Sequence, residues 1–155
     1  MFEILMFLFE NYMNGNITLA ADHQTILTEL EKIGFDRFEI GRAIDWLEGL
    51  HQFQASVQSG PQLTSLSMRY YVAEETERLG VEGVGLLARL EHLNILDPIT
   101  REVVIDRLMA LDPREVDLGR IKWVVLLALF NQPDKKSAIV LLQDMILADA
   151  FKVIH

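Results

Sequence analysis

The sequence predicts a mostly α-helical protein: a helical domain with a winged-helix-like N-terminal part, made of three helices and a short β-hairpin, and a C-terminal helical bundle. Half of the 155 residues are apolar, which excludes a disordered chain. Apolar residues recur at helical spacing over most of the chain, and they alternate with polar residues only between 52 and 72. We therefore expect two domains, a winged-helix-like module over 1–72 and a helical bundle over 73–155.

The first helix is expected in the apolar stretch from Met1 to Met13. Glu3 and Glu10 fall on one narrow stripe of such a helix, so that its other sides can be buried. The stretch lacks the basic start of a secretory signal and is too short to span a bilayer. We therefore expect a core helix in a cytoplasmic protein that does not contact a membrane.

Two further helices are predicted between residues 22 and 50. Gly34 can end the first of them in a left-handed conformation. The second begins after Asp36, whose spacing to Glu39 is that of a capping box. Because only Gly34 and Phe35 separate the two helices, the pair must turn sharply, as in a helix-turn-helix.

A two-stranded hairpin is predicted after the third helix. Phe53, Ala55 and Val57 alternate with polar neighbours, and a second alternating run extends over residues 66–72. The polar segment between the runs contains Gly60-Pro61 and is typical of a loop. An irregular linker between two helical halves is the alternative.

The second half is predicted to be helical throughout. A helix over 82–94 precedes one that begins at Asp97-Pro98, where the aspartate can cap the helix and the proline can occupy its first position. Asp112-Pro113 repeats this signal, and residues 112–116 are predicted to form a single turn before the next long helix. The next helix, over 118–131, is apolar nearly all round and should lie at the centre of this half. The last helix begins at Pro133.

Residue types and spacing weigh against catalytic and metal sites. The chain has no cysteine, which excludes thiol nucleophiles, disulfides and Cys-based metal sites and suits a reducing compartment. Glu48 and His51 form one E-x-x-H step, whereas a di-iron site of this type needs two. Gly80, Gly83 and Gly85 stand in the wrong order for a dinucleotide fingerprint, and Gly80 is interpreted as a helix stop. We expect a protein that is not an enzyme and that binds neither cofactor nor metal.

Charge favours a protein partner over a nucleic acid. The net charge is -9, and residues 1–54 contain three basic and nine acidic residues, so the predicted helix-turn-helix would repel a duplex. We expect an interaction module that docks a protein partner, and a homodimer is one form that this can take. The candidate partner surface on the third helix consists of Arg37, Glu39, Arg42, Asp45 and Glu48.

The alternative is a winged-helix nucleic-acid-binding protein that uses a local basic patch. Residues 97–131 contain five basic and six acidic residues, so only a small part of this segment could contact phosphates. A solvated surface of salt bridges is the plainer interpretation. The candidate patch consists of Arg69, Arg101, Arg107, Arg114, Arg120 and Lys122.

Several blocks of the sequence resemble the Smg family of small proteobacterial proteins. The blocks are MFEILMFLFENY, IGFDRFEIGRAIDWLEGL, SMRYYVAEETERL, REVVIDRLMALD and DLGRIKWVVLLALFNQP. The resemblance extends from Met1 to about Pro133, and the tail beyond departs most from the pattern. It implies a domain of unknown function without assigned catalytic or binding residues. Genes of the family often lie near genes for DNA-processing and topoisomerase-like proteins, so the resemblance also implies a context in DNA metabolism.

Overall fold

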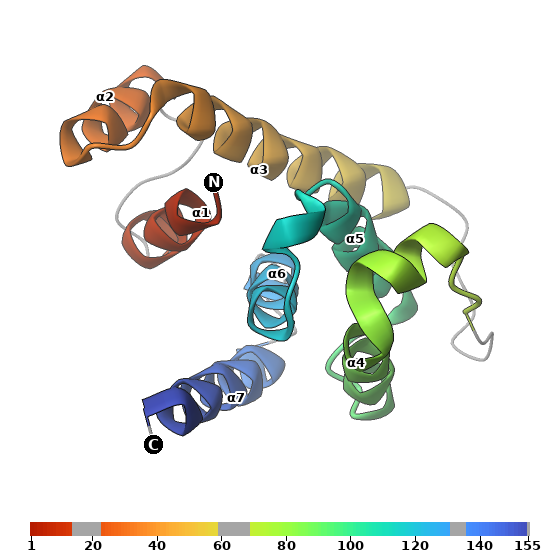
Figure 1. Ribbon diagram of the computed structural model, residues 1–155. Coiled ribbons are helices and arrows are strands. Elements are labelled where there is room, and N and C mark those ends of the chain that lie inside the picture. The colour runs from red at the N-terminus through yellow and green to blue at the C-terminus, as the bar shows by residue number, and fades with distance from the viewer. Residues whose placement is uncertain (14–22, 59–68, 131–135, 155) are drawn as a thin grey trace. The chain divides into compact units, whose positions relative to one another are not determined.

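A computed structural model of the chain describes residues 1–13, 23–58, 69–130 and 136–154, and every element in these ranges is helical (Figure 1). The chain forms two compact units, Met1–Gly49 and Leu50–His155, and the division falls inside one long helix. The sequence-based division into 1–72 and 73–155 stays a prediction. None of the described helices combines the length and the hydropathy of a membrane-spanning segment.

The N-terminal stretch forms the predicted core helix. α1 spans Phe2–Leu8 and continues into one π-helical turn, η1, over Phe9–Met13. Glu3 and Glu10 are exposed, which confirms the narrow polar stripe. The apolar side chains that this segment buries are Met1, Phe2, Ile4, Leu5, Leu8 and Phe9.

α2 (His23–Ile33) and α3 (Arg37–Gln58) are joined by the predicted sharp turn (Figure 1). Gly34 ends α2 with φ of 111°, a left-handed value that a residue with a side chain rarely adopts. Asp36 caps α3, because its Oδ2 accepts the N–H of Phe38 at 3.1 Å. The ring of Phe35 meets the ring of Phe7 edge to face, with centroids 6.1 Å apart, and so joins the turn to α1.

The predicted β-hairpin is not supported, and neither is the winged-helix-like assignment that depends on it. No strand occurs in the described residues, and α3 runs through Phe53, Ala55 and Val57 without a break. Residues 69–72 belong to no helix or strand. Residues 59–68, with Gly60-Pro61 and the start of the second predicted strand, lie outside the described residues.

A helical contact explains why the alternation after Leu50 does not produce a strand. Leu50, Phe53 and Gln54 recur at the spacing of one helix face. Nε2 of Gln54 donates to the main-chain oxygen of Ala128 at 3.0 Å, which gives a hydrogen bond to a carbonyl in the last turn of another helix. A helix therefore places the apolar Leu50 and Phe53 and the polar Gln54 on the same side of the chain, where Gln54 can make this bond.

The second unit is organised around one apolar helix. Its elements are α4 (Ala73–His92), α5 (Pro98–Met109), the 3₁₀ turn η2 (Pro113–Glu115), α6 (Leu118–Phe130) and α7 (Lys136–Ile154). α6 packs against α4, α5 and α7 and buries every residue from Val124 to Leu129, which confirms its predicted central place. The predicted cap of α5 is confirmed too, since Oδ1 of Asp97 accepts the N–H of Thr100 at 2.7 Å.

α4 begins at Ala73, earlier than the predicted start at residue 82, and Gly80 divides it. Gly80 has φ of 71° and ψ of 168°, a combination that is almost confined to glycine, so the predicted helix stop becomes a kink within one element. Beyond the kink, Gly83 allows α4 to approach α6 closely. A Cβ at Gly83 would lie 2.9 Å from Cδ1 of Ile121.

Replacing the kink glycine should destabilise the protein. We expect Gly80→Ala to lower the free energy of unfolding by about 1–3 kcal/mol, because an L side chain is strained in this backbone conformation. Gly85→Ala is the matched control, since Gly85 lies in the same helix with open space around it and should gain about 0.5–1 kcal/mol. Urea denaturation measures both, and equal effects of the two substitutions would contradict the kink as the cause.

Candidate functional site

The five residues of the predicted partner surface all lie on α3 with exposed side chains. Ile40, Ala43 and Leu47 are buried on the opposite side of the helix. Arg37, Arg42, Asp45 and Glu48 fall within an arc of about 140° on the helix surface. Glu39 lies beside this arc, and its Oε2 is 3.7 Å from the amino group of Met1.

The residue that sequence reasoning missed on this surface is Phe38. Its side chain is 73% exposed, between the charged residues of the first turns of α3. Ile33, the last residue of α2, is 54% exposed. Phe38 is out of phase with Ile40, Ala43 and Leu47, so the helical period could have revealed its exposure. We call Ile33, Phe38 and the five predicted residues the α3 surface.

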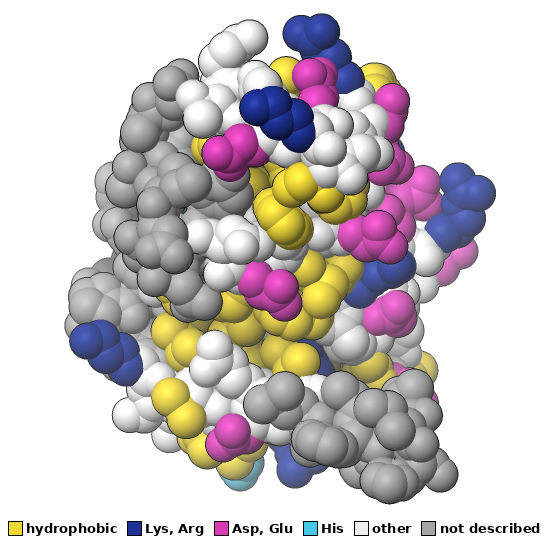
Figure 2. Space-filling view, turned by 90° about the vertical axis from the view of Figure 1, so that its left-hand side faces the viewer, with side chains coloured by type: hydrophobic (Ala, Val, Ile, Leu, Met, Phe, Trp, Pro, Cys, Tyr) yellow, Lys and Arg dark blue, Asp and Glu magenta, His cyan; other side chains and the backbone are white. Residues whose placement is uncertain are grey.

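The α3 surface belongs to an acidic unit. Residues 1–49 contain nine acidic and three basic residues, and thus a formal charge of -6 out of the -9 of the chain. Figure 2 shows basic side chains as isolated groups among carboxylates and exposed apolar side chains on the face that it draws.

The residues of the predicted basic patch are engaged in ion pairs or buried. Arg107 bonds Asp106 at 2.7 Å, Arg114 approaches Asp112 at 3.3 Å and Arg120 approaches Asp117 at 3.9 Å. Lys122 is 9% exposed in α6. Arg69 and Arg101 are brought together by a shared contact, the carboxylate of Glu102.

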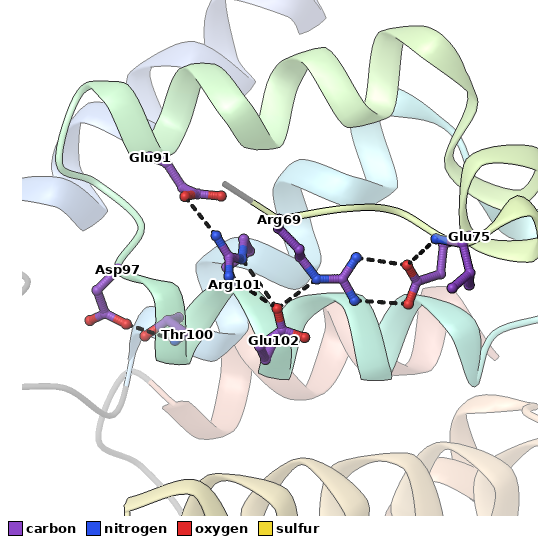
Figure 3. A network of polar contacts seen from close by, with 8 residues as sticks. Arg69, Glu75, Glu91, Asp97, Thr100, Arg101 and Glu102 are labelled. Carbon is purple, nitrogen blue, oxygen red and sulfur yellow. Dashed lines mark hydrogen bonds and ion pairs between the residues drawn. The ribbon is translucent and has the colours of Figure 1, made fainter. Parts of the chain in front are cut away.

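Arg69, Glu75, Glu91, Arg101 and Glu102 form one connected network, the Arg69–Arg101 network (Figure 3). Arg69 holds both oxygens of Glu75, at 2.7 and 2.9 Å, and its Nε donates to Glu102 at 2.6 Å. Arg101 donates to the same oxygen of Glu102 at 3.2 Å and to Glu91 at 2.9 Å. The network therefore ties the segment before α4, both ends of α4 and the start of α5 together. The two arginines were predicted as candidate residues from the sequence, but their carboxylate partners were not.

Pairing inside the network shifts proton affinities. The guanidinium of Arg69 bonds Glu75 and lowers the pKa of its carboxyl, against the opposing effect of partial burial; the N–H of Val72 adds to the lowering. The carboxylates in turn raise the pKa of Arg69, Glu75 first. Burial raises the pKa of Tyr71, whose ring lies 4.7 Å from the Arg69 guanidinium carbon.

A depression of about 290 Å³ is lined by Glu74, Glu77 and Arg78 of α4, Met109 of α5 and Pro113 of η2. Arg78 donates through Nη1 to the main-chain oxygens of Met109 and Leu111, at 2.9 and 2.6 Å, and thereby caps the end of α5. Its guanidinium thus has a structural task in the depression. Within the described ranges no three His, Asp or Glu side chains are grouped as metal ligands, Glu48 and His51 included.

Comparison with known proteins identifies relatives along the whole chain. The family model described as "Protein of unknown function (DUF494)" matches residues 1–155, including the tail after Pro133. The chain is 37% identical over 153 residues to "Protein Smg homolog" of Nitrosococcus oceani, covering 99% of this chain and 96% of that protein. It is 44% identical over 140 residues to "Protein Smg" of Salmonella newport, covering 89% of each. No solved structure matches it.

Breaking the Arg69–Arg101 network should destabilise the second unit. We expect Arg69→Met to lower the free energy of unfolding by about 1–3 kcal/mol, because it removes both hydrogen bonds from Arg69 to the partly buried Glu75 and one of those that Glu102 accepts. Arg114→Met is the matched control: Arg114 is 91% exposed and its pair with Asp112 is solvated, so no measurable change is expected. Chemical denaturation followed by circular dichroism measures both variants, and a neutral Arg69→Met would show that the network contributes nothing.

The lowered pKa of Glu75 predicts a loss of stability in acid. A carboxyl whose pKa is lower in the folded than in the unfolded chain stabilises the fold above its unfolded pKa, and this contribution disappears as the pH falls through the folded pKa. We expect Glu75→Gln to be less stable than the parent at neutral pH and to lose less on acidification. Glu74→Gln, on the same turn with an exposed side chain, should keep the parental pH dependence. Chemical denaturation at a series of pH values measures this dependence. Parallel plots of unfolding free energy against pH for Glu75→Gln and the parent would refute a contribution of Glu75 to acid sensitivity.

Proposed function

We propose that this chain, which belongs to the DUF494 family of proteins of unknown function, is a non-catalytic docking module for another protein. The α3 surface is the proposed contact. The observation that carries this proposal is the exposure of Phe38, an aromatic side chain 73% open to solvent in the first turn of a charged helix. Aromatic side chains supply much of the binding energy of protein interfaces, and they gain it by entering a pocket of the partner.

The surroundings of Phe38 define the kind of partner. Ile33 adds apolar area at the α2–α3 corner, and the charged side chains of α3 provide a polar rim. Because the unit has a formal charge of -6, a partner with a basic rim around an apolar pocket is the best electrostatic match. Proteins that act on DNA carry such basic surfaces. A context in DNA metabolism, implied by the family resemblance, therefore fits a partner of this kind.

Direct binding of nucleic acid has less support. A protein that binds phosphates needs basic groups that can exchange counterions for them. Five of the six candidate residues are arginines that already contact carboxylates, and Lys122 is buried. Freeing Arg69 for a phosphate would take the arginine partner from Glu75, and freeing Arg101 would take it from Glu91; both carboxylates are partly buried.

Substitution of Phe38 should abolish partner recovery without unfolding the chain. We expect the tagged parent to recover a stoichiometric protein from lysate, and Phe38→Ser to reduce recovery about 30-fold, the effect of losing an anchor worth about 2 kcal/mol. Substitution of Glu39, Asp45 and Glu48 by lysine should also reduce the amount of recovered partner, and this reduction should be larger at low salt than at high salt. Val81→Ser is the matched control, because Val81 is an apolar residue with an exposed fraction of 85% that lies on α4.

Two outcomes would contradict the docking proposal. One is recovery that Phe38→Ser and the charge reversals leave unchanged. The other is retardation of labelled DNA or RNA by the parent at low salt that declines steeply as salt rises, combined with no recovered protein. Circular dichroism of each variant separates loss of binding from loss of fold.

A further inference from the structure

The outer side of α7 exposes one apolar side chain, Val140, among polar and charged ones, with Leu141 at its edge. Ala138 and Leu142 are buried on the side of α7 that packs against α6. Val140 lies opposite them on the helix and Leu141 beside them, and each is 55% exposed. The face is in the second unit and is independent of the α3 surface, so its assignment does not rest on the proposed function.

The charges on this face are arranged symmetrically about Val140. Lys136 lies four residues before Val140 and Asp144 four residues after it, and both side chains are exposed. Residues four apart follow one row along a helix surface. If a second α7 is placed antiparallel across this row, with a twofold axis beside Val140, each lysine meets an aspartate. The row is thus complementary to itself.

The net charge of α7 also suits contact between identical chains. Lys136–Ile154 contains two lysines and two aspartates, so this helix is neutral in a chain with a net charge of -9. Residues 1–49, with nine acidic and three basic residues, would repel their own copy. Of the two, α7 is the segment on which two copies can meet without such repulsion.

We propose that the outer face of α7 binds a second copy of this chain in an isologous, antiparallel contact. Val140 packs beside its symmetry mate, Leu141 flanks it, and Lys136 pairs with Asp144 of the partner subunit, twice in the dimer. Rows of residues four apart align in this way when two helices cross at about -50°. One helix pair covers less area than a standard stable interface, so the dimer should form reversibly and dissociate on dilution.

Sedimentation velocity of the full chain over a series of concentrations tests this contact by charge exchange. We expect Lys136→Asp alone, and Asp144→Lys alone, each to raise the dimer Kd about tenfold, because each replaces two attractive pairs by two repulsive ones. The double variant K136D/D144K should return to within about twofold of the parental Kd, since both pairs form again with reversed polarity. An equimolar mixture of the two single variants should form a heterodimer as tight as the parental dimer, although each alone is weakened.

Glu82→Lys is the matched control, because it reverses an exposed acidic residue on α4 and should leave the Kd unchanged. All substituted side chains are exposed, and unchanged circular dichroism should show that folding is intact. A strict monomer at every concentration overturns the proposal and leaves the face to a different protein. A dimer with the same Kd in both single variants overturns it as well, because the contact then lies elsewhere. Failure of the mixture and the double variant to restore association rejects the antiparallel pairing.

Discussion

The need to cover α6 on all sides is the constraint on which the second unit depends. A helix that is apolar around its whole circumference is stable in water only when neighbours surround it. α4, α5 and α7 supply that cover, and Gly83 lets α4 come close enough to touch Ile121. The ends of buried helices then need donors for their last carbonyls. Arg78 provides them for α5, and Gln54 provides one for α6.

The excess of acidic residues determines what the arginines of this unit do. Each guanidinium of the predicted basic patch has a carboxylate within reach, and Arg69 and Arg101 share one. Partly buried charges require such partners, because a buried charge left without its partner destabilises the fold by more than the intact pair stabilises it. Charges used in this way organise the fold, holding the segment before α4 against α5, and contribute little attraction for phosphate. The acidic side chains of α3, by contrast, remain at the surface and contribute to the negative field of the first unit.

Local signals in the sequence predicted most of the helices, because the information lay within a few residues. The cap at Asp97, the left-handed Gly34 and the apolar circumference of α6 each depend on near neighbours or on helical phase alone. The prediction of a hairpin was wrong because three apolar residues that alternate with polar ones are too short a pattern to distinguish a strand from a helix. The deciding contact, from Gln54 to Ala128, joins residues far apart in the chain. The same distance hid Glu75, Glu91 and Glu102 as partners of the arginines, whereas helical phase contained enough to find Phe38.

The α3 surface and the outer face of α7 differ in charge, and therefore in the kind of partner that we propose for each. The α3 surface combines a single large anchor with the charge of an acidic unit, and two copies of it would bring like fields together. Such a surface suits a partner of different composition, whose basic groups complete the electrostatic match. α7 has no net formal charge, and Lys136 and Asp144 lie at equal distances along the helix on either side of Val140. In the proposed antiparallel dimer each lysine would therefore face an aspartate of the other copy. A dimer through α7 would present two α3 surfaces, and an oligomeric or repetitive partner would then bind with higher avidity than either surface alone provides.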